Sequence, residues 1–219
     1  MQRSEEFYKK QFGPWYDQLK KIVYSERFDR LLDELKDLDH DDSMRPKRSV
    51  IFAPFRYFHP SKLKLVILAE RPPLIKNYNG LALADNPESF SLTHRSAAIM
   101  QKIEETFYDG MLLNYDYSLE NLAKQGVLLL NASLTTGSEM VAHEEFWEPF
   151  IFVLIKNIIR NNKDVPFILF GERTFKFNVV LAEANAKFIK VSNPMIGAVD
   201  KWNFPIKEID KLTKHKINW

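Results

Sequence analysis

Four short apolar runs, set apart by longer segments with helical spacing, constrain the fold of this chain most strongly. Strands are predicted at four ranges: 63–69, 126–131, 165–170 and 187–192. Between them, apolar side chains recur at the spacing of one helix face over about 93–107, 143–161 and 172–184. Strands that alternate with helices predict an α/β protein, with three αβα layers around a central four-stranded, mostly parallel sheet.

The N-terminal part, residues 1–48, is predicted to be largely helical, because apolar residues recur at helical spacing from Glu5 to about Leu38. Gly13-Pro14 is expected to interrupt or begin a helix there. The later elements follow one another through short connections, without a repeat or a low-complexity tract. A chain of 219 residues can bury a sizeable core, so we expect a single domain over residues 1–219.

The composition narrows the ligands and the compartment. The chain has no cysteine, which excludes disulfides and thiolate metal sites, and its five histidines lack metal-ligand spacing. We therefore expect neither a metal nor another cofactor. No apolar run approaches the length of a membrane span, and charges interrupt every apolar stretch near the N-terminus. We expect a cytoplasmic or nucleoid/nuclear protein that is not secreted and has no membrane partner.

Charge is unevenly distributed, although the net charge of +2 does not itself indicate a nucleic-acid binder. Residues 44–64 contain six basic side chains and no acidic one. Among these, Arg45, Lys47 and Arg48 are candidate contacts to a DNA backbone, and the aromatic residues of the same segment could stack on bases. The alternative is that the aromatic residues pack in the core and the cations form a solvated face.

Polar residues follow the ends of the predicted strands. They stand at 70–73, at 131–133, at Gly171-Glu172 and at Asn193-Pro194. In an open parallel sheet, ligands bind beyond the carboxyl ends of the strands. We therefore expect these four loops to meet at one rim and to form a single site.

The order of the motifs at this rim resembles a family 1 uracil-DNA glycosylase. The first predicted strand leads into Ala69-Glu70-Arg71-Pro72-Pro73, where that family has GQDPY. Residues 80–84 read GLALA where the family has GLAFS, and residues 125–131 read QGVLLLN as in the family. The resemblance covers most of the chain. It implies the uracil-DNA glycosylase fold, DNA as a partner and, for an intact site, base flipping and cleavage of the N-glycosidic bond.

The residues that carry out the family's chemistry are replaced. Arg71 stands where the family has the Asp that orients water and balances the cationic sugar. Asn193 stands where the family has a His, or Ser192 does if the alignment slides by one residue. Glu70 either substitutes for the missing carboxylate or is a solvated side chain paired with Arg71 or a lysine, because neighbouring residues of an extended segment point in opposite directions.

The resemblance also assigns a base pocket and backbone contacts. Asn131 corresponds to the amide that reads the uracil edge, although an Asn after a buried strand can equally cap or bridge a loop. Leu83 replaces a stacking Phe, and Pro73 replaces a Tyr that excludes the thymine methyl. Ser91 and Arg173 correspond to positions near the DNA backbone. Ile196 is the nearest candidate for the family's wedge residue.

Three functions are compatible with these features. The first is a protein without normal uracil excision that binds DNA as an accessory factor in replication or repair. The second is an interaction module that docks a protein partner on the former DNA face, where Glu172 would repel a phosphate. The third is an active glycosylase that acts on uracil or a modified base through Glu70 and Asn131. We favour the first, because the Asp and the His of the family are both replaced.

Overall fold

The fold is built on a parallel four-stranded sheet. The computed structural model describes residues 3–38, 44–75, 77–85, 95–111, 114–137, 143–194 and 202–219. The strands are β1 (Leu65–Ala69), β2 (Val127–Asn131), β3 (Phe167–Phe170) and β4 (Phe188–Val191). All three pairings are parallel, in the order β2-β1-β3-β4. Each observed strand lies within a predicted run, so the predicted four-stranded sheet is confirmed.

Helices occupy both faces of this sheet. They are α1 (Glu5–Phe12), α2 (Tyr16–Val23), α3 (Glu26–Asp37), α4 (Arg95–Phe107), α5 (Glu120–Lys124), α6 (Glu144–Asn161), α7 (Asn178–Glu183) and α8 (Ile206–Leu212). Short 3-10 turns are η1 (Gly13–Trp15), η2 (Arg48–Val50), η3 (Ala53–Arg56), η4 (Pro60–Lys62) and η5 (Glu172–Phe177). The expected interruption at Gly13-Pro14 is the turn η1 between α1 and α2. The expected helix at 172–184 begins as η5 and continues as α7.

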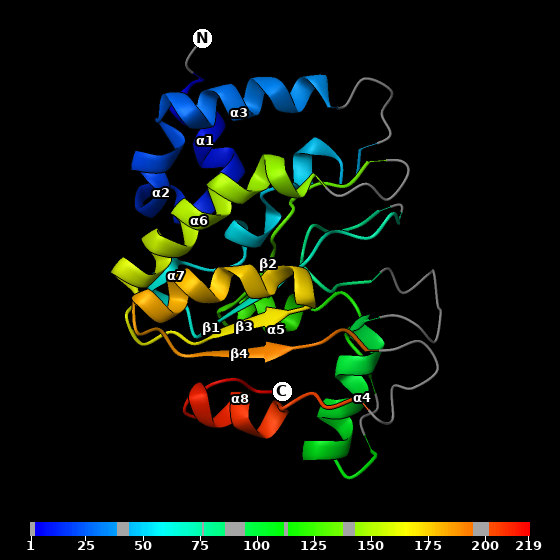
Figure 1. The fold of residues 1–219 in the computed structure, drawn as a ribbon. Helices are drawn as coiled ribbons and strands as arrows, with labels where there is room; N and C mark the ends of the chain where they lie inside the picture. The colour runs from blue at the N-terminus through cyan, green and yellow to red at the C-terminus, as the bar shows by residue number, and fades with distance from the viewer. Residues whose placement is uncertain are drawn as a thin grey trace.

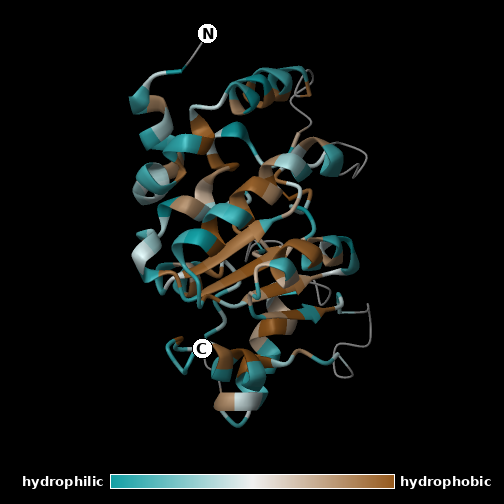
Figure 2. Ribbon diagram, turned by 60° about the vertical axis from the view of Figure 1, so that its left-hand side comes forward, coloured by the Kyte–Doolittle hydropathy of each residue, from teal (hydrophilic) through white to brown (hydrophobic). Residues whose placement is uncertain are grey.

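Alternation along each strand divides the core into two clusters. Val66 and Leu68 of β1 face the cluster that contains α1, α2, α3, α6 and α7. Leu65 and Ile67 face the cluster that contains α4, α5 and α8. Successive side chains of a strand point to opposite faces, so both faces need a helical cover. Figure 1 shows the sheet between these two helical layers, and Figure 2 shows hydrophobic strands enclosed by helices with hydrophilic outer faces. The predicted three-layer α/β architecture is confirmed.

Three of the four aromatic residues of the basic segment lie inside the first cluster, and the fourth, Tyr57, is half-buried and donates to Glu120 at 3.3 Å. Phe52, Phe55 and Phe58 are buried, and Phe55 packs on Trp15 at 5.7 Å between ring centroids. Burial of this kind excludes them as exposed stacking platforms for bases. Of the two interpretations of residues 44–64, the aromatic side chains fit the core interpretation, and only the cations remain as candidate nucleic-acid contacts.

Candidate functional site

The carboxyl ends of the four strands meet at one rim. The register pairs Ala69 with both Asn131 and Phe170, and it pairs Phe170 with Val191. Hydrogen bonds continue this pairing past the strands: Ser133 N donates to Glu70 O at 2.9 Å, and Gly171 N donates to Val191 O at 2.7 Å. The polar loops predicted to form one site are therefore brought together.

Glu70 is fixed at the centre of this rim, between the ends of β3 and β4. Its carboxylate accepts from the backbone N of Arg173 and from the side-chain Nδ2 of Asn193, each at 3.1 Å. A Cβ on Gly171 would lie 2.5 Å from the Glu70 carboxylate, so a glycine is needed for this close approach. Glu70 stands in the family's water-orienting loop, and Asn193 stands where the family has its His. A carboxylate–amide hydrogen bond thus joins these two positions.

Arg71, Pro72 and Pro73 follow Glu70 across the rim toward the loop after β2. Arg71 and Pro73 are half-buried, whereas Pro72 is buried. The carbonyl of Pro72 accepts from Thr136 Oγ1 at 3.2 Å, and this bond fixes the path of the segment. The chain thus presents a guanidinium and a proline at the two positions where the family has its Asp and Tyr.

Asn131, the residue corresponding to the uracil-reading amide, is buried and bound to a tyrosine. Its Nδ2 donates to the hydroxyl of Tyr78 at 3.1 Å, and that hydroxyl donates to the carbonyl of Leu81. Tyr78 is itself buried, and desolvation raises the pKa of its phenol well above the usual value, so it stays protonated and needs an acceptor. The Oδ1 atoms of Asn131 and Asn193 are buried and have no hydrogen-bond partner among the described residues.

The segment that carries Tyr78 is pressed against neighbouring backbone. Gly80 has φ +86, and a Cβ there would lie 2.2 Å from the carbonyl oxygen of Val50. Ala82 N donates to Leu129 O at 3.1 Å, which ties the segment to β2. Leu83, where the family places its stacking Phe, is buried with φ +67. An aliphatic side chain offers no π-face for a base, so this position does not reproduce aromatic stacking.

Basic residues line a cavity of about 550 Å³ that also has Tyr78 in its lining. Arg45 and Lys47 contribute the cations, and Asn77 and Asn79 contribute amides. Arg45 is anchored to the loop after β2, because it exchanges backbone hydrogen bonds of 2.8 and 2.7 Å with Thr136. Two of the three predicted basic contacts, Arg45 and Lys47, therefore lie in the same cavity lining as Tyr78.

The other described candidates for DNA-backbone contacts, Arg48 and Arg173, do not line this cavity. Arg48 Nη2 donates to the carbonyl of Lys36 at the end of α3, at 3.3 Å. Arg173 forms a 2.7 Å ion pair with Glu144, which raises the pKa of the guanidinium. Ser192, the alternative residue at the family's His position, is exposed. The backbone candidate Ser91 and the wedge candidate Ile196 lie outside the described residues.

Tyr78 is the site residue that the sequence analysis missed. It stands two residues before the GLALA segment, and an aromatic residue that close to a pocket motif was the available signal. Within the described ranges, no group of three or more His, Asp or Glu side chains is arranged to hold a metal ion. Among the described helices, none combines the length and the apolar character needed to cross a membrane.

The chain has the architecture of three-layer α/β proteins, with polar residues gathered at the carboxyl ends of a parallel sheet. In proteins of this class, ligands bind at the strand ends. No family model matches the chain. The uracil-DNA glycosylase of Mycoplasma pneumoniae is 27% identical over 205 residues, which cover 88% of this chain and 85% of that relative. The uracil-DNA glycosylase of Francisella tularensis subsp. tularensis is 30% identical over 159 residues, which cover 68% of each chain.

A solved structure has the same fold. The crystal structure of mimivirus uracil-DNA glycosylase matches with a TM-score of 0.69 at 20% identity, over 83% of this chain and 68% of that chain. The chain therefore belongs to the uracil-DNA glycosylase family, and the fold expected from its motifs is confirmed.

Proposed function

We propose that this chain is a DNA-binding member of the family without normal uracil excision, acting as an accessory factor in DNA replication or repair. The hydrogen bond between Asn131 Nδ2 and the buried Tyr78 hydroxyl carries the proposal. An amide that reads a pyrimidine edge offers it one N–H and its Oδ1; here one of the two Nδ2 hydrogens is engaged by Tyr78, and the side chain is buried, which supports an amide fixed inside the protein. We expect one domain that works in the cytoplasm, on the nucleoid or in a nucleus.

The groups around this amide support the same conclusion. Arg71 places a cation where a negative charge would balance the positively charged sugar of the transition state. Asn193 donates to Glu70 rather than presenting an imidazole to the departing base. A positioned general acid or base typically contributes about 10²–10⁴-fold to a rate, so the loss of both leaves little of the family's acceleration.

Binding to DNA is supported by the basic cavity beside Tyr78. Arg45 and Lys47 lie at its lining, and the backbone bridge between Arg45 and Thr136 ties this segment to the loop after β2. Contacts from such cations to phosphates release counterions and make binding depend on salt. In this proposal a DNA strand lies along the cavity while its bases stay outside the closed pocket.

A charge-reversal variant tests this surface. We expect Arg45→Glu with Lys47→Glu to weaken binding to labelled single- and double-stranded oligonucleotides at least about tenfold at low salt. For duplex DNA, the salt slope should fall by roughly 0.9 for each phosphate that the variant no longer neutralises. The control is Lys207→Glu with Lys211→Glu on α8, which changes the net charge equally on exposed residues that do not line the basic cavity. Equal weakening of DNA binding in both variants would mean that net charge, and not this cavity, causes the effect. No binding at low salt would instead favour a protein partner on this face.

A second candidate function, excision through Glu70 and Asn131, rests on the fixed carboxylate at the rim and the unpartnered Oδ1 of Asn131. We expect it to fail in a direct assay. Alkali-sensitive sites in uracil-containing single-stranded DNA should stay at background for both the parent chain and Glu70→Gln. Excision by the parent that falls by about 10²-fold or more in Glu70→Gln would make Glu70 a catalytic residue and overturn the proposal.

A further inference from the structure

An apolar groove lies between α3 and α6, away from the strand-end rim. Its cavity measures about 430 Å³, within the range of about 300–1,000 Å³ found for binding pockets. The apolar lining consists of Ile22, Phe28, Leu31, Pro149, Phe150 and Val153. Val153 is 41% exposed in the middle of α6, which leaves an apolar side chain of this groove open to solvent. In Figure 1 the strands point toward the side where α6 begins, whereas the groove involves the later turns of that helix.

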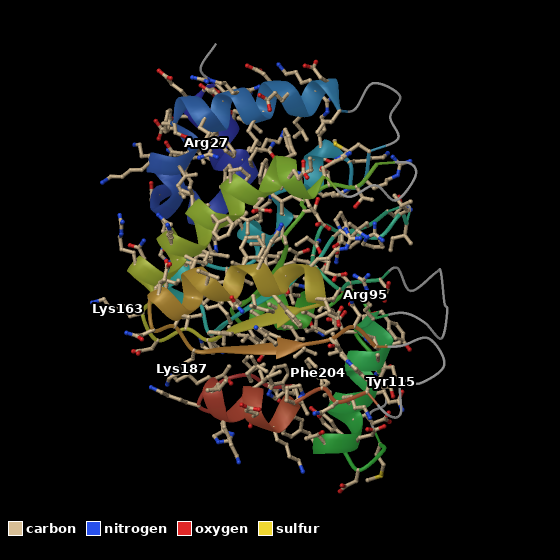
Figure 3. The ribbon with its side chains drawn as sticks, in the orientation of Figure 1. Arg27, Arg95, Tyr115, Lys163, Lys187 and Phe204 are labelled. Atoms are coloured by element: carbon tan, nitrogen blue, oxygen red, sulfur yellow. The ribbon has the colours of Figure 1, made fainter. Side chains whose placement is uncertain are left out.

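Four cations surround this groove: Lys21, Arg27, Lys156 and Arg160. The lining contains no Asp or Glu, and none of the four cations forms an ion pair with an acidic side chain of the described residues. They come from three different helices, and Figure 3 places Arg27 on α3. Glu145 and Glu148 line an adjoining cavity with Arg27 and Lys156, but they do not line the groove itself. An apolar floor with cations and no carboxylate in its lining is complementary to an anionic amphipathic ligand.

Helix dipoles explain only part of this arrangement. Lys21 and Arg160 stand in the last turns of α2 and α6, where cations are favourable. Arg27, however, is the second residue of α3, where the dipole disfavours a cation, and Lys156 is in the interior of α6. The stability of the helices therefore does not account for all four cations around the groove.

The remaining polar groups of the groove are already satisfied inside the protein. Ser25 Oγ donates to Ile22 O at 2.7 Å and accepts from Phe28 N at 3.2 Å. The side chain of Asn157 exchanges hydrogen bonds with Gln18, at 3.2 and 3.3 Å. A ligand is thus offered apolar contact and positive charge, with few directional hydrogen bonds. This favours a helix that inserts apolar side chains over a small molecule that needs polar recognition.

We infer that the groove between α3 and α6 docks an acidic amphipathic helix of a partner protein. Apolar side chains at helical spacing would cover Val153 and Phe150, and flanking carboxylates would pair with Lys156 and Arg160, which lie four residues apart on one face of α6. The groove is separate from the basic cavity at Tyr78, so this partner binds independently of DNA. An accessory factor with both surfaces brings its partner to DNA.

Fluorescence anisotropy with a labelled peptide tests the inference. The probe is a helical peptide of about four turns with Leu on one face and Glu on both flanks. We expect saturable binding by the full chain, weakened at least about tenfold in Lys156→Glu with Arg160→Glu and also in Val153→Asp. The Lys207→Glu, Lys211→Glu variant should bind as the parent does, and thermal melts check that all variants fold.

Three outcomes would overturn the inference. One is the absence of saturable binding up to about 1 mM peptide. Another is equal binding of a peptide with the same Leu face and Lys in place of Glu. The third is binding of phosphatidylserine-containing vesicles, abolished in the Lys156→Glu, Arg160→Glu variant, by a chain that does not bind the acidic peptide. DNA affinity serves as an independent readout and should not change in the groove variants.

Discussion

Replacing Tyr78 with Phe is expected to lower the free energy of unfolding by roughly 2–4 kcal/mol, although it removes a single oxygen atom. The hydroxyl accepts from Asn131 Nδ2 and donates to Leu81 O, and all three groups are buried. Its removal leaves a buried donor and a buried acceptor unpaired, and each such group costs about 1–3 kcal/mol. Chemical denaturation of the parent and Tyr78→Phe chains, with unchanged denaturant dependence, measures the difference.

A double-mutant cycle with Asn131→Ala assigns this loss to the pair. The coupling energy between Tyr78→Phe and Asn131→Ala should reach about 0.5–3 kcal/mol, as for residues in direct hydrogen-bond contact. Tyr115→Phe is a matched control, because its hydroxyl bonds to Glu104 in a half-buried position where water can replace the contact. A Tyr78→Phe chain as stable as the parent would show that the phenol does not hold the amide, and the pocket would then be free to read a base.

The proposed lack of uracil excision has two components, the replaced catalytic groups and the buried base-reading amide. A missing catalytic group can be restored by one substitution at its own position, whereas the Asn131 amide is released only by a separate change at Tyr78. Restoring the family's carboxylate at position 71 would leave Asn131 bound to Tyr78. In the proposed function, the lack of uracil excision therefore rests on the recognition step as well as on the chemical step.

The architecture could be predicted because it follows from local patterns of apolar residues along the chain. β1, β2 and β3 are short, largely apolar runs, and the long helices α3, α4 and α6 repeat their apolar face over several turns. The sequence analysis did not find α5 and α8, because helices of five and seven residues contain two turns or fewer of periodicity.

The site could be predicted only in part, because its contacts join distant positions. Residue types at strand ends placed Glu70, Asn131 and Asn193 at one rim. The partners of Glu70, however, are 103 and 123 residues away, and Tyr78 is 53 residues from Asn131. No spacing rule connects such positions, since their contacts depend on the strand order and on the path of the 77–85 segment.

Gly80→Ala is expected to lower the free energy of unfolding by roughly 2–5 kcal/mol, because Gly80 sets the path of the segment that carries Tyr78. A methyl group there meets the carbonyl oxygen of Val50 at 2.2 Å, and this contact is with backbone that cannot rotate away. The φ of +86 adds left-handed strain of about 1–2 kcal/mol, and overpacking adds about 1–3 kcal/mol. Urea unfolding of the parent and the variant measures the total.

Gly110 is a control that separates the two costs, because its φ is +78 while nothing lies within 4 Å of an added Cβ. Gly110→Ala should lose only the conformational term of about 1–2 kcal/mol. Equal losses in the two variants would mean that the 77–85 segment shifts away from Val50 at little cost. The closed pocket would then be a weakly held state that DNA could open. A larger loss of stability in Gly80→Ala than in Gly110→Ala means that the close contact between Gly80 and Val50 fixes the segment that carries Tyr78.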